Sequence, residues 1–342
     1  MKFGPAPLEH AEGKILGHNV AGEDGKRLLR KGKPLLAEDI AALRALRRTS
    51  VYVAEMEPGD LDEDAAARRV AEAVKGADEG LRLPGAASGR ANLLATARGV
   101  LRVDVERLVR LNSCQGLTLA TLASHTPVRA RQIVATVKVI PFAVPEATVR
   151  AAEAIAGESG PLLRVDGLNP QNVGLIFSGS VSIREKLADD FAPLRERVEA
   201  LGSQITSTDY VPLEDESGEA ALAEVLVRQR ASGAALVILA GETAIMDRHD
   251  IVPRAIDRAG GRVECLGVPV DPGNLLMLAY LDGVPVLGAP GCARSRKTNI
   301  VDWVLPRLLA GDRLTQADFI SLGHGGLLED APERPMPRHK AG

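Results

Sequence analysis

The sequence predicts an α/β protein with a C-terminal, doubly wound and mostly parallel sheet and an N-terminal α+β accessory domain. After residue 172, short uninterrupted apolar segments alternate with helical patterns. Such segments are typical of parallel strands whose two faces are both covered by helices. Before residue 165, strands and helices follow one another irregularly, and Gly167 and Pro170 mark a linker between the two regions.

The N-terminal region, residues 1–165, is predicted to be the accessory domain. Apolar residues at helical spacing predict a first helix near residues 39–46, and a polar, alanine-rich segment predicts a second helix at 62–75. Short or alternating apolar segments predict strands at 13–20, 51–56, 99–104, 117–122 and 132–144.

The C-terminal region, residues 172–330, is predicted to form the doubly wound domain, and residues 331–342 a flexible tail. A strand at 275–281 breaks the parallel order, because an Asp282-Gly283 turn joins it to the next strand as a hairpin. The other predicted strands are 173–177, 204–210, 235–239, 262–266 and 284–287. The predicted helices are 184–201, 219–230, 251–259 and 300–309.

Composition limits the kinds of partner. The formal net charge is −3 and 25% of the residues are charged, so we expect no nucleic-acid partner. Three widely spaced cysteines form neither a disulfide framework nor a zinc motif, which favours a reducing cytoplasm. The N-terminus lacks a signal-peptide pattern, and the longest apolar run, 234–240, is far below the ~20 residues of a membrane span. We therefore expect a cytoplasmic protein without a membrane partner.

The candidate site lies where predicted strands end, because ligands of doubly wound sheets bind at the carboxyl ends of strands. Three strand ends carry small and polar residues, and a further loop at 268–274 contains a Pro-Gly pair. The candidate ligand-binding residues of these loops are Ser178, Gly179, Ser180, Gly241, Thr243, Pro272, Gly273, Asn274, Pro290, Gly291, Cys292, Arg294 and Ser295.

The loop after the strand at 284–287 is the candidate anion site. It combines a Gly/Pro turn with Ser295 and the cations Arg294, Arg296 and Lys297, just before a predicted helix. A helix N-terminus offers free N–H groups and the positive end of the helix dipole, which suits an anion. The alternative is a solvated basic turn. Cys292 is expected to have a lowered pKa beside Arg294 and the helix start, or else to be a small packing residue.

Carboxylates in two loops are the candidate Mg²⁺ ligands and catalytic groups. Asp250 and Asp215 are the first candidates for the metal, and Asp247 and Glu242 the second. Asp250, Asp215 and Glu242 are the candidate catalytic residues. Mg²⁺ takes oxygen ligands and shares them with substrate phosphate. Asp250 alone is also explained as the N-cap of the helix at 251–259.

Taken in chain order, the loop motifs of residues 172–310 resemble those of the molybdopterin-binding domain shared by molybdopterin adenylyltransferases and molybdenum insertases. Ser178-Gly179-Ser180 stands where the family has a Thr-Gly turn, and the loop at 211–218 resembles its Val-Pro-Asp-Asp loop. Gly241-Glu242-Thr243-Ala244 stands where a Gly-Gly-Thr-Gly or Gly-Gly-Val-Ser loop is expected, so Glu242 replaces a glycine and Ala244 a small or hydroxyl residue. Cys292 stands where the family usually has Asn. Residues 12–20 and 28–53 are similar to insertase segments.

The resemblance implies molybdopterin or its adenylylated form as the ligand, with Mg²⁺, ATP or AMP, and molybdate as further participants. It implies Mg²⁺-dependent adenylyl transfer or molybdate insertion in the cytoplasm. One alternative is a protein that binds, delivers or senses the cofactor without catalysis. Another is a nucleotide pyrophosphohydrolase of the competence-damage type. The implied partners are other cofactor-synthesis proteins or a molybdoenzyme, and the resemblance implies a homo-oligomer.

Overall fold

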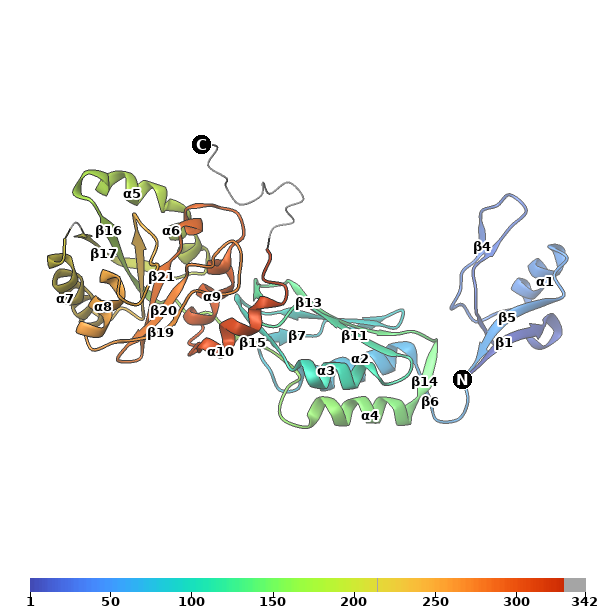
Figure 1. Cartoon of the computed structure of the whole chain (residues 1–342). Helices are drawn as coiled ribbons and strands as arrows, with labels where there is room; N and C mark the ends of the chain where they lie inside the picture. The colour runs from blue at the N-terminus through green and yellow to red at the C-terminus, as the bar shows by residue number, and fades with distance from the viewer. Residues whose placement is uncertain (214, 329–342) are drawn as a thin grey trace. The chain divides into compact units, whose positions relative to one another are not determined.

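The computed structural model describes residues 1–213 and 215–328 and divides into two compact units (Figure 1). The first unit comprises Met1–Ala97 and Leu101–Val165, and the second comprises Arg98–Val100 and the chain from Asp166 onward. The tail predicted at 331–342 lies outside the described residues. No helix of the described chain has the length and apolar character needed to cross a membrane.

The start of the first unit is a small sheet with its own core. Strands β1, β5 and β2 form an antiparallel sheet in the order β1-β5-β2. Leu8, Leu16, Leu35 and Leu43 are buried in its core. The strand predicted at 13–20 is split into two short strands, β2 and β3. The elements are β1 (Lys2–Pro7), η1 (Leu8–His10), β2 (Ile15–Leu16), β3 (Val20–Ala21), β4 (Arg27–Leu29), α1 (Ala37–Ala45) and β5 (Ser50–Glu55).

The rest of the first unit packs helices on an antiparallel sheet of order β11-β13-β9-β7. Helix α2 begins after Asp62, whose carboxylate accepts hydrogen bonds from the N–H groups of Asp64 and Ala65. Its buried stripe, with Val70 and Val74, joins the core of this sheet. The elements are β6 (Asp60–Asp62), α2 (Glu63–Lys75), β7 (Leu81–Arg82), β8 (Ala86–Ala87), β9 (Arg90–Ala95), β10 (Gly99–Val103), α3 (Val105–Asn112), β11 (Leu117–Thr121), β12 (Pro127–Val128), β13 (Ile133–Val139), β14 (Ala143–Pro145), α4 (Glu146–Gly157) and β15 (Leu163–Gly167).

The second unit is built on a six-stranded sheet of order β17-β16-β18-β21-β20-β19. Strands β17, β16, β18 and β21 run parallel, and β20 and β19 are antiparallel to their neighbours. The predicted hairpin is confirmed: Asp282 and Gly283, both at positive φ, join β20 to β21. The strands are β16 (Asn172–Gly179), β17 (Gln204–Pro212), β18 (Leu236–Gly241), β19 (Arg262–Leu266), β20 (Met277–Leu281) and β21 (Val284–Ala289).

Helices cover both faces of this sheet (Figure 1). Leu175 and Phe177 of β16 pack on one side with α5, α6 and α9, whereas Ile176 between them packs on the other side with α7 and α8. This two-sided burial explains why β16 is continuously apolar in the sequence. The helices are α5 (Arg184–Asp190), α6 (Ala192–Ala200), α7 (Ser217–Ala231), α8 (Ile251–Arg258), α9 (Ile300–Leu309) and α10 (Gln316–Ile320), with the 3-10 helices η2 (Val181–Ile183), η3 (Gly291–Arg294) and η4 (Ser321–Gly323).

The single helix predicted at 184–201 is wrong, because the chain forms two helices that meet at Phe191. Pro193 lies in the first turn of α6. Proline has no N–H to continue the hydrogen-bond ladder of α5, but it is tolerated in the first turn of a new helix. The buried Phe191 at the junction also packs against Phe177, with 6.1 Å between ring centroids.

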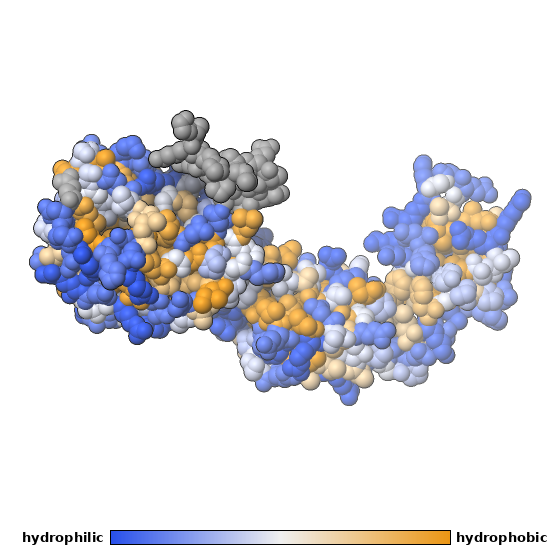
Figure 2. Space-filling view, viewed as in Figure 1, coloured by the Kyte–Doolittle hydropathy of each residue, from blue (hydrophilic) through white to orange (hydrophobic). Residues whose placement is uncertain are grey.

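The visible surface of the protein mixes hydrophilic residues with smaller hydrophobic patches (Figure 2).

Candidate functional site

A cavity of about 400 Å³ lies at the carboxyl ends of β16 and β18. Strand β16 lies between β17 and β18 in the sheet. The chain passes from β16 to β17 on one side of it and then crosses back to β18 on the other side, so the strand order reverses at β16. Such a switch in strand order is where doubly wound folds open a crevice for ligands. We call this space the switch-point cavity, and its lining residues are Ser178, Gly179, Ser180, Leu213, Leu239, Gly241, Glu242, Thr243, Ala244, Ile245, Asp250, Ile251, Val252 and Ala289.

The structure brings together only part of the residues that the sequence singled out. Those that line the cavity are Ser178, Gly179, Ser180, Gly241, Glu242, Thr243 and Asp250. Those outside its lining are Asp215, Asp247, Pro272, Gly273, Asn274, Pro290, Gly291, Cys292, Arg294 and Ser295. Sequence reasoning missed the apolar wall, to which Leu239, Ile245 and Val252 contribute. Its only signal in the sequence is that these residues adjoin a strand end or a helix start.

The carboxylate of Glu242 is held at the end of β16. Its Oε2 atom accepts hydrogen bonds from the backbone N–H of Ser180, at 2.8 Å, and from the Ser180 hydroxyl, at 2.6 Å. These two hydrogen bonds lower the pKa of the Glu242 carboxyl. The backbone N–H of Glu242 also donates to the carbonyl of Ser178, at 2.8 Å. The strand-end loops of β16 and β18 are therefore joined through an ionised side chain.

The approach of these two loops requires glycine at position 179. A Cβ atom there would lie 2.7 Å from the Cβ of Glu242 and 2.8 Å from its Oε2, which is closer than real Cβ contacts. The carbonyl of Ser180 accepts a hydrogen bond from the Tyr210 hydroxyl of β17, at 2.5 Å. Three neighbouring strands thus contribute to the position of the Ser180 donors.

Arg294 holds the same region from the far side of β18. Its Nη2 donates to the carbonyl oxygens of Gly241, at 2.8 Å, and Glu242, at 3.3 Å. The guanidinium lies over the ring of Phe191, 4.8 Å from the centroid. This cation therefore contacts the loop after β18, while its buried Nε has no hydrogen-bond partner among the described residues. The ligand contact that the sequence suggested stays a prediction.

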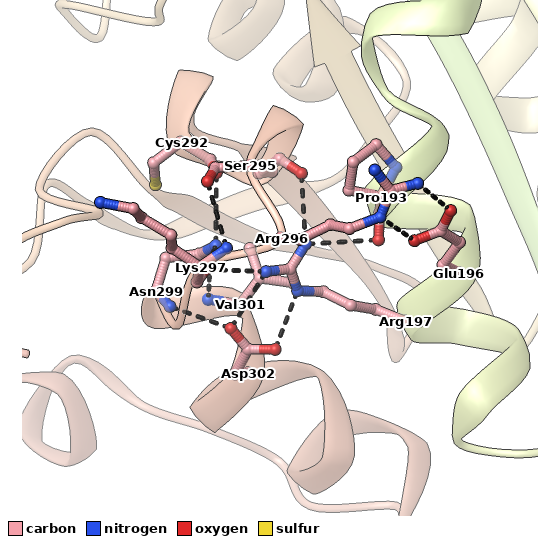
Figure 3. A network of polar contacts seen from close by, with 11 residues as sticks. Pro193, Glu196, Arg197, Cys292, Ser295, Arg296, Lys297, Asn299, Val301 and Asp302 are labelled. Atoms are coloured by element: carbon pink, nitrogen blue, oxygen red, sulfur yellow. Dashed lines mark hydrogen bonds and ion pairs between the residues drawn. The ribbon is translucent and has the colours of Figure 1, made fainter.

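The turn after β21 is fixed by its own side chains, as Figure 3 shows. Helix α9 begins at Ile300, and the buried Asn299 caps it by accepting the Val301 N–H at 3.0 Å. The Ile300 N–H donates to the carbonyl of Pro272, at 3.2 Å. Asp302 accepts the Asn299 N–H at 2.9 Å. The N–H groups at the start of α9 are therefore engaged within the chain.

The charges of this turn also have partners within the chain. Arg296 forms an ion pair with Glu196 of α6 (Figure 3). Arg197 of α6 binds Asp302 through Nε, at 2.8 Å, and donates to the carbonyl of Lys297, at 3.0 Å. Ser295 accepts the Lys297 N–H, at 3.1 Å. This geometry favours a structural role for the turn over the anion site expected from the sequence.

The three aspartates proposed as Mg²⁺ ligands accept hydrogen bonds from N–H groups of their own loops. Asp250 Oδ2 accepts from the N–H groups of Met246 and Asp247, at 2.6 and 3.0 Å. Asp247 accepts from His249, at 2.8 Å, and Asp215 from the N–H of Ser217, also at 2.8 Å. Within residues 1–213 and 215–328, no group of three or more His, Cys, Asp or Glu side chains is placed to hold a metal ion. Asp250 does stand at the expected N-cap position of α8, but its side chain makes no cap hydrogen bond to that helix.

The lowered pKa expected for Cys292 is wrong. The thiol is half-buried, and burial raises its pKa more than the charge of Arg197 lowers it. The Arg294 guanidinium, expected to favour a thiolate, instead binds the carbonyls after β18. The structure therefore favours the other interpretation of Cys292, a small residue packed in a turn.

Comparisons with known proteins give distant similarities. Residues 5–55 match the family model described as Domain of unknown function (DUF8806). No curated protein matches the chain. A molybdopterin biosynthesis MoeA protein from Pyrococcus horikosii is 13% identical over 90% of this chain and 75% of its own, with a TM-score of 0.29. A molybdenum cofactor biosynthesis protein from Pyrococcus furiosus is 12% identical over 94% of this chain and 65% of its own, with a TM-score of 0.23. This chain thus spans less than two thirds of the length of the second protein.

Proposed function

We propose that the protein binds a molybdopterin-type ligand in the switch-point cavity and does not itself transfer an adenylyl group or insert molybdate. The observation that carries the proposal is the position of the cavity, at the carboxyl ends of the two strands between which the strand order reverses. The ordered motifs of residues 172–310 support the ligand class, because they resemble those of molybdopterin-binding domains.

The lining of the cavity supports a flat heterocyclic ligand. Leu239, Ile245 and Val252 offer apolar surface, and Ser178, Glu242 and Thr243 offer hydrogen-bonding groups. A volume of about 400 Å³ falls in the range of roughly 300–1,000 Å³ that is typical of small-molecule sites. A pterin has apolar ring faces and an edge of hydrogen-bond donors and acceptors, so it complements both kinds of surface.

The charges near the cavity support binding more than phosphoryl chemistry. Cleavage or formation of a phosphoanhydride needs positive charge that offsets the charge of the phosphates. Arg294, a cation of the turn after β21, is bound through Nη2 to the carbonyls of Gly241 and Glu242. Asp250 is engaged by two backbone N–H groups. Arg294 and Asp250 thus already make hydrogen bonds within the protein that a phosphate or a metal ion would have to replace.

The test is a titration of the protein with molybdopterin under anaerobic conditions, followed by calorimetry. We expect one ligand per chain, and we expect Ala244→Trp to abolish binding because Ala244 is exposed and lines the cavity. Ala231→Trp, at the exposed end of α7, is the matched control and should bind as the parent does. Equal binding by Ala244→Trp would place the site elsewhere. Release of pyrophosphate or AMP after addition of ATP and Mg²⁺ would show that the protein is an enzyme.

A further inference from the structure

The carboxylate of Glu242 accepts the hydrogen bonds of the donors at the end of β16. The N–H and the hydroxyl of Ser180 both point to one oxygen of Glu242, at 2.8 and 2.6 Å. Backbone N–H groups at the end of a buried strand are a common binding place for the phosphate of a ligand. In this protein a side chain from the neighbouring loop takes that place.

We propose that Glu242 determines ligand specificity by closing the end of β16 to phosphate and by accepting the uncharged amino edge of a heterocycle instead. The proposal rests on the proposed function in two respects, which are the switch-point cavity as the ligand site and the identity of the heterocycle as a pterin. It implies that a ligand enters the switch-point cavity with its aminopyrimidine ring toward Glu242 and leaves its phosphate outside.

Two properties of Glu242 exclude a phosphate group. Its Oε2 uses both donors of Ser180, so a phosphate would have to displace it from two hydrogen bonds. The carboxylate is ionised at neutral pH, as an ordinary glutamate is, and the hydrogen bonds from Ser180 lower its pKa further. Two like charges placed side by side in a site repel each other strongly. Arg294 turns Nη2 to the loop carbonyls, and its guanidinium is stacked on Phe191. Its buried Nε has no hydrogen-bond partner among the described residues, and its charge lowers the pKa of Glu242, so Arg294 offsets part of this repulsion.

The same carboxylate suits a neutral heterocycle that donates hydrogen bonds. The second oxygen, Oε1, accepts no hydrogen bond from the residues that the structure describes, and Glu242 is exposed to the cavity. The amino group and the ring N–H of an aminopyrimidinone present two donors on one edge. Hydrogen bonds from neutral donors to a carboxylate are short and stronger than those between neutral groups. Glu242 can therefore bind Ser180 and a ligand at the same time.

The experiment measures the affinity for inorganic phosphate and for AMP by calorimetry in the parent and two variants. Glu242→Gly removes the carboxylate, and we expect it to bind either anion at least about tenfold more tightly than the parent. Glu242→Gln removes the charge but keeps an oxygen that can accept from Ser180, so we expect a smaller gain. Glu199→Gln, an exposed residue of α6, makes the same change of charge away from the cavity and should gain nothing.

Equal phosphate affinity in the parent and in both Glu242 variants would overturn the proposal. If Glu242→Gly fails to fold, as its thermal melting curve would show, Glu242→Gln alone decides. A parallel titration with 6-hydroxymethylpterin, which carries no phosphate, separates the two proposals. If no form of the protein binds that pterin, the proposed function fails, while the comparison of phosphate affinities still decides the role of Glu242.

Discussion

Replacement of Arg294 by Met tests whether this cation serves the fold or a ligand. Methionine keeps most of the apolar stem of arginine but removes the guanidinium. That group donates to the carbonyls of Gly241 and Glu242, at 2.8 and 3.3 Å, and lies over Phe191. If the role is structural, the protein without any ligand must lose stability.

The magnitude follows from these contacts. A hydrogen bond from a charged group contributes about 1.5–3 kcal/mol, and a partly buried cation–π contact adds roughly 0.5–1 kcal/mol. The longer bond to Glu242 adds little, so the free energy of unfolding should fall by about 2–4 kcal/mol. For a domain of about 150–250 residues this corresponds to a fall in melting temperature of roughly 4–16 °C.

The assay is scanning calorimetry of the ligand-free protein, with Arg296→Met as the matched control. Arg296 pairs with Glu196 at the surface, where the two side chains are 72% and 50% exposed. Such an exposed pair contributes about 0–1 kcal/mol. If Arg294→Met melts at the same temperature as Arg296→Met and instead loses affinity for an anionic ligand, then the structural assignment of Arg294 is incorrect.

Three further outcomes test the same region. Asn299→Ala should lower the free energy of unfolding by about 1–2 kcal/mol, measured in urea, because it removes the buried cap of α9; an unchanged urea midpoint would contradict the capping role. Cys292 should react with iodoacetamide at pH 7 more slowly than free cysteine, because burial raises its pKa; peptide mass mapping measures the rate, and fast alkylation would restore the thiolate hypothesis. Asp250→Asn keeps one acceptor oxygen and should change the free energy of unfolding by less than about 1 kcal/mol. Thermal melts should show no stabilisation of either form by Mg²⁺. A stabilisation by Mg²⁺ that is present in the parent and lost in Asp250→Asn would support the metal site.

The elements of the second unit followed closely from the sequence. Strands such as β16 are apolar on both faces, and α9 has apolar residues at helical spacing, so each pattern has a single simple interpretation. The error in the helix at 184–201 also has a local cause. Apolar periodicity continued across Phe191, and Pro193 was the only signal of the break.

The candidate site was predictable only at the level of the backbone. Parallel strands end at one edge of a sheet, so the loops after β16 and β18 had to meet, and Ser180 and Glu242 do lie together. Partnerships between distant side chains were not predictable. Arg294 reaches Gly241, 53 residues earlier, and Arg296 reaches Glu196, 100 residues earlier. From the sequence alone, the cations clustered before the helix at 300–309 predicted an anion site. In the structure, Arg294 binds loop carbonyls and Arg296 binds a surface carboxylate.

Glu242 and Arg294 hold the loop after β18 from its two sides. A carboxylate in the loop after β18 fixes that loop to the end of β16 through Ser180, and the guanidinium fixes the same loop through its carbonyls from the other side. The two opposite charges lie in one small region, where Arg294 also helps to lower the pKa of Glu242. A glycine at position 242 would leave the Ser180 donors open to an anion. With glutamate there, the loops are already ordered before any ligand arrives, and little conformational entropy remains to be lost on binding. The carboxylate that joins the two loops is thus the same charge that selects against phosphate.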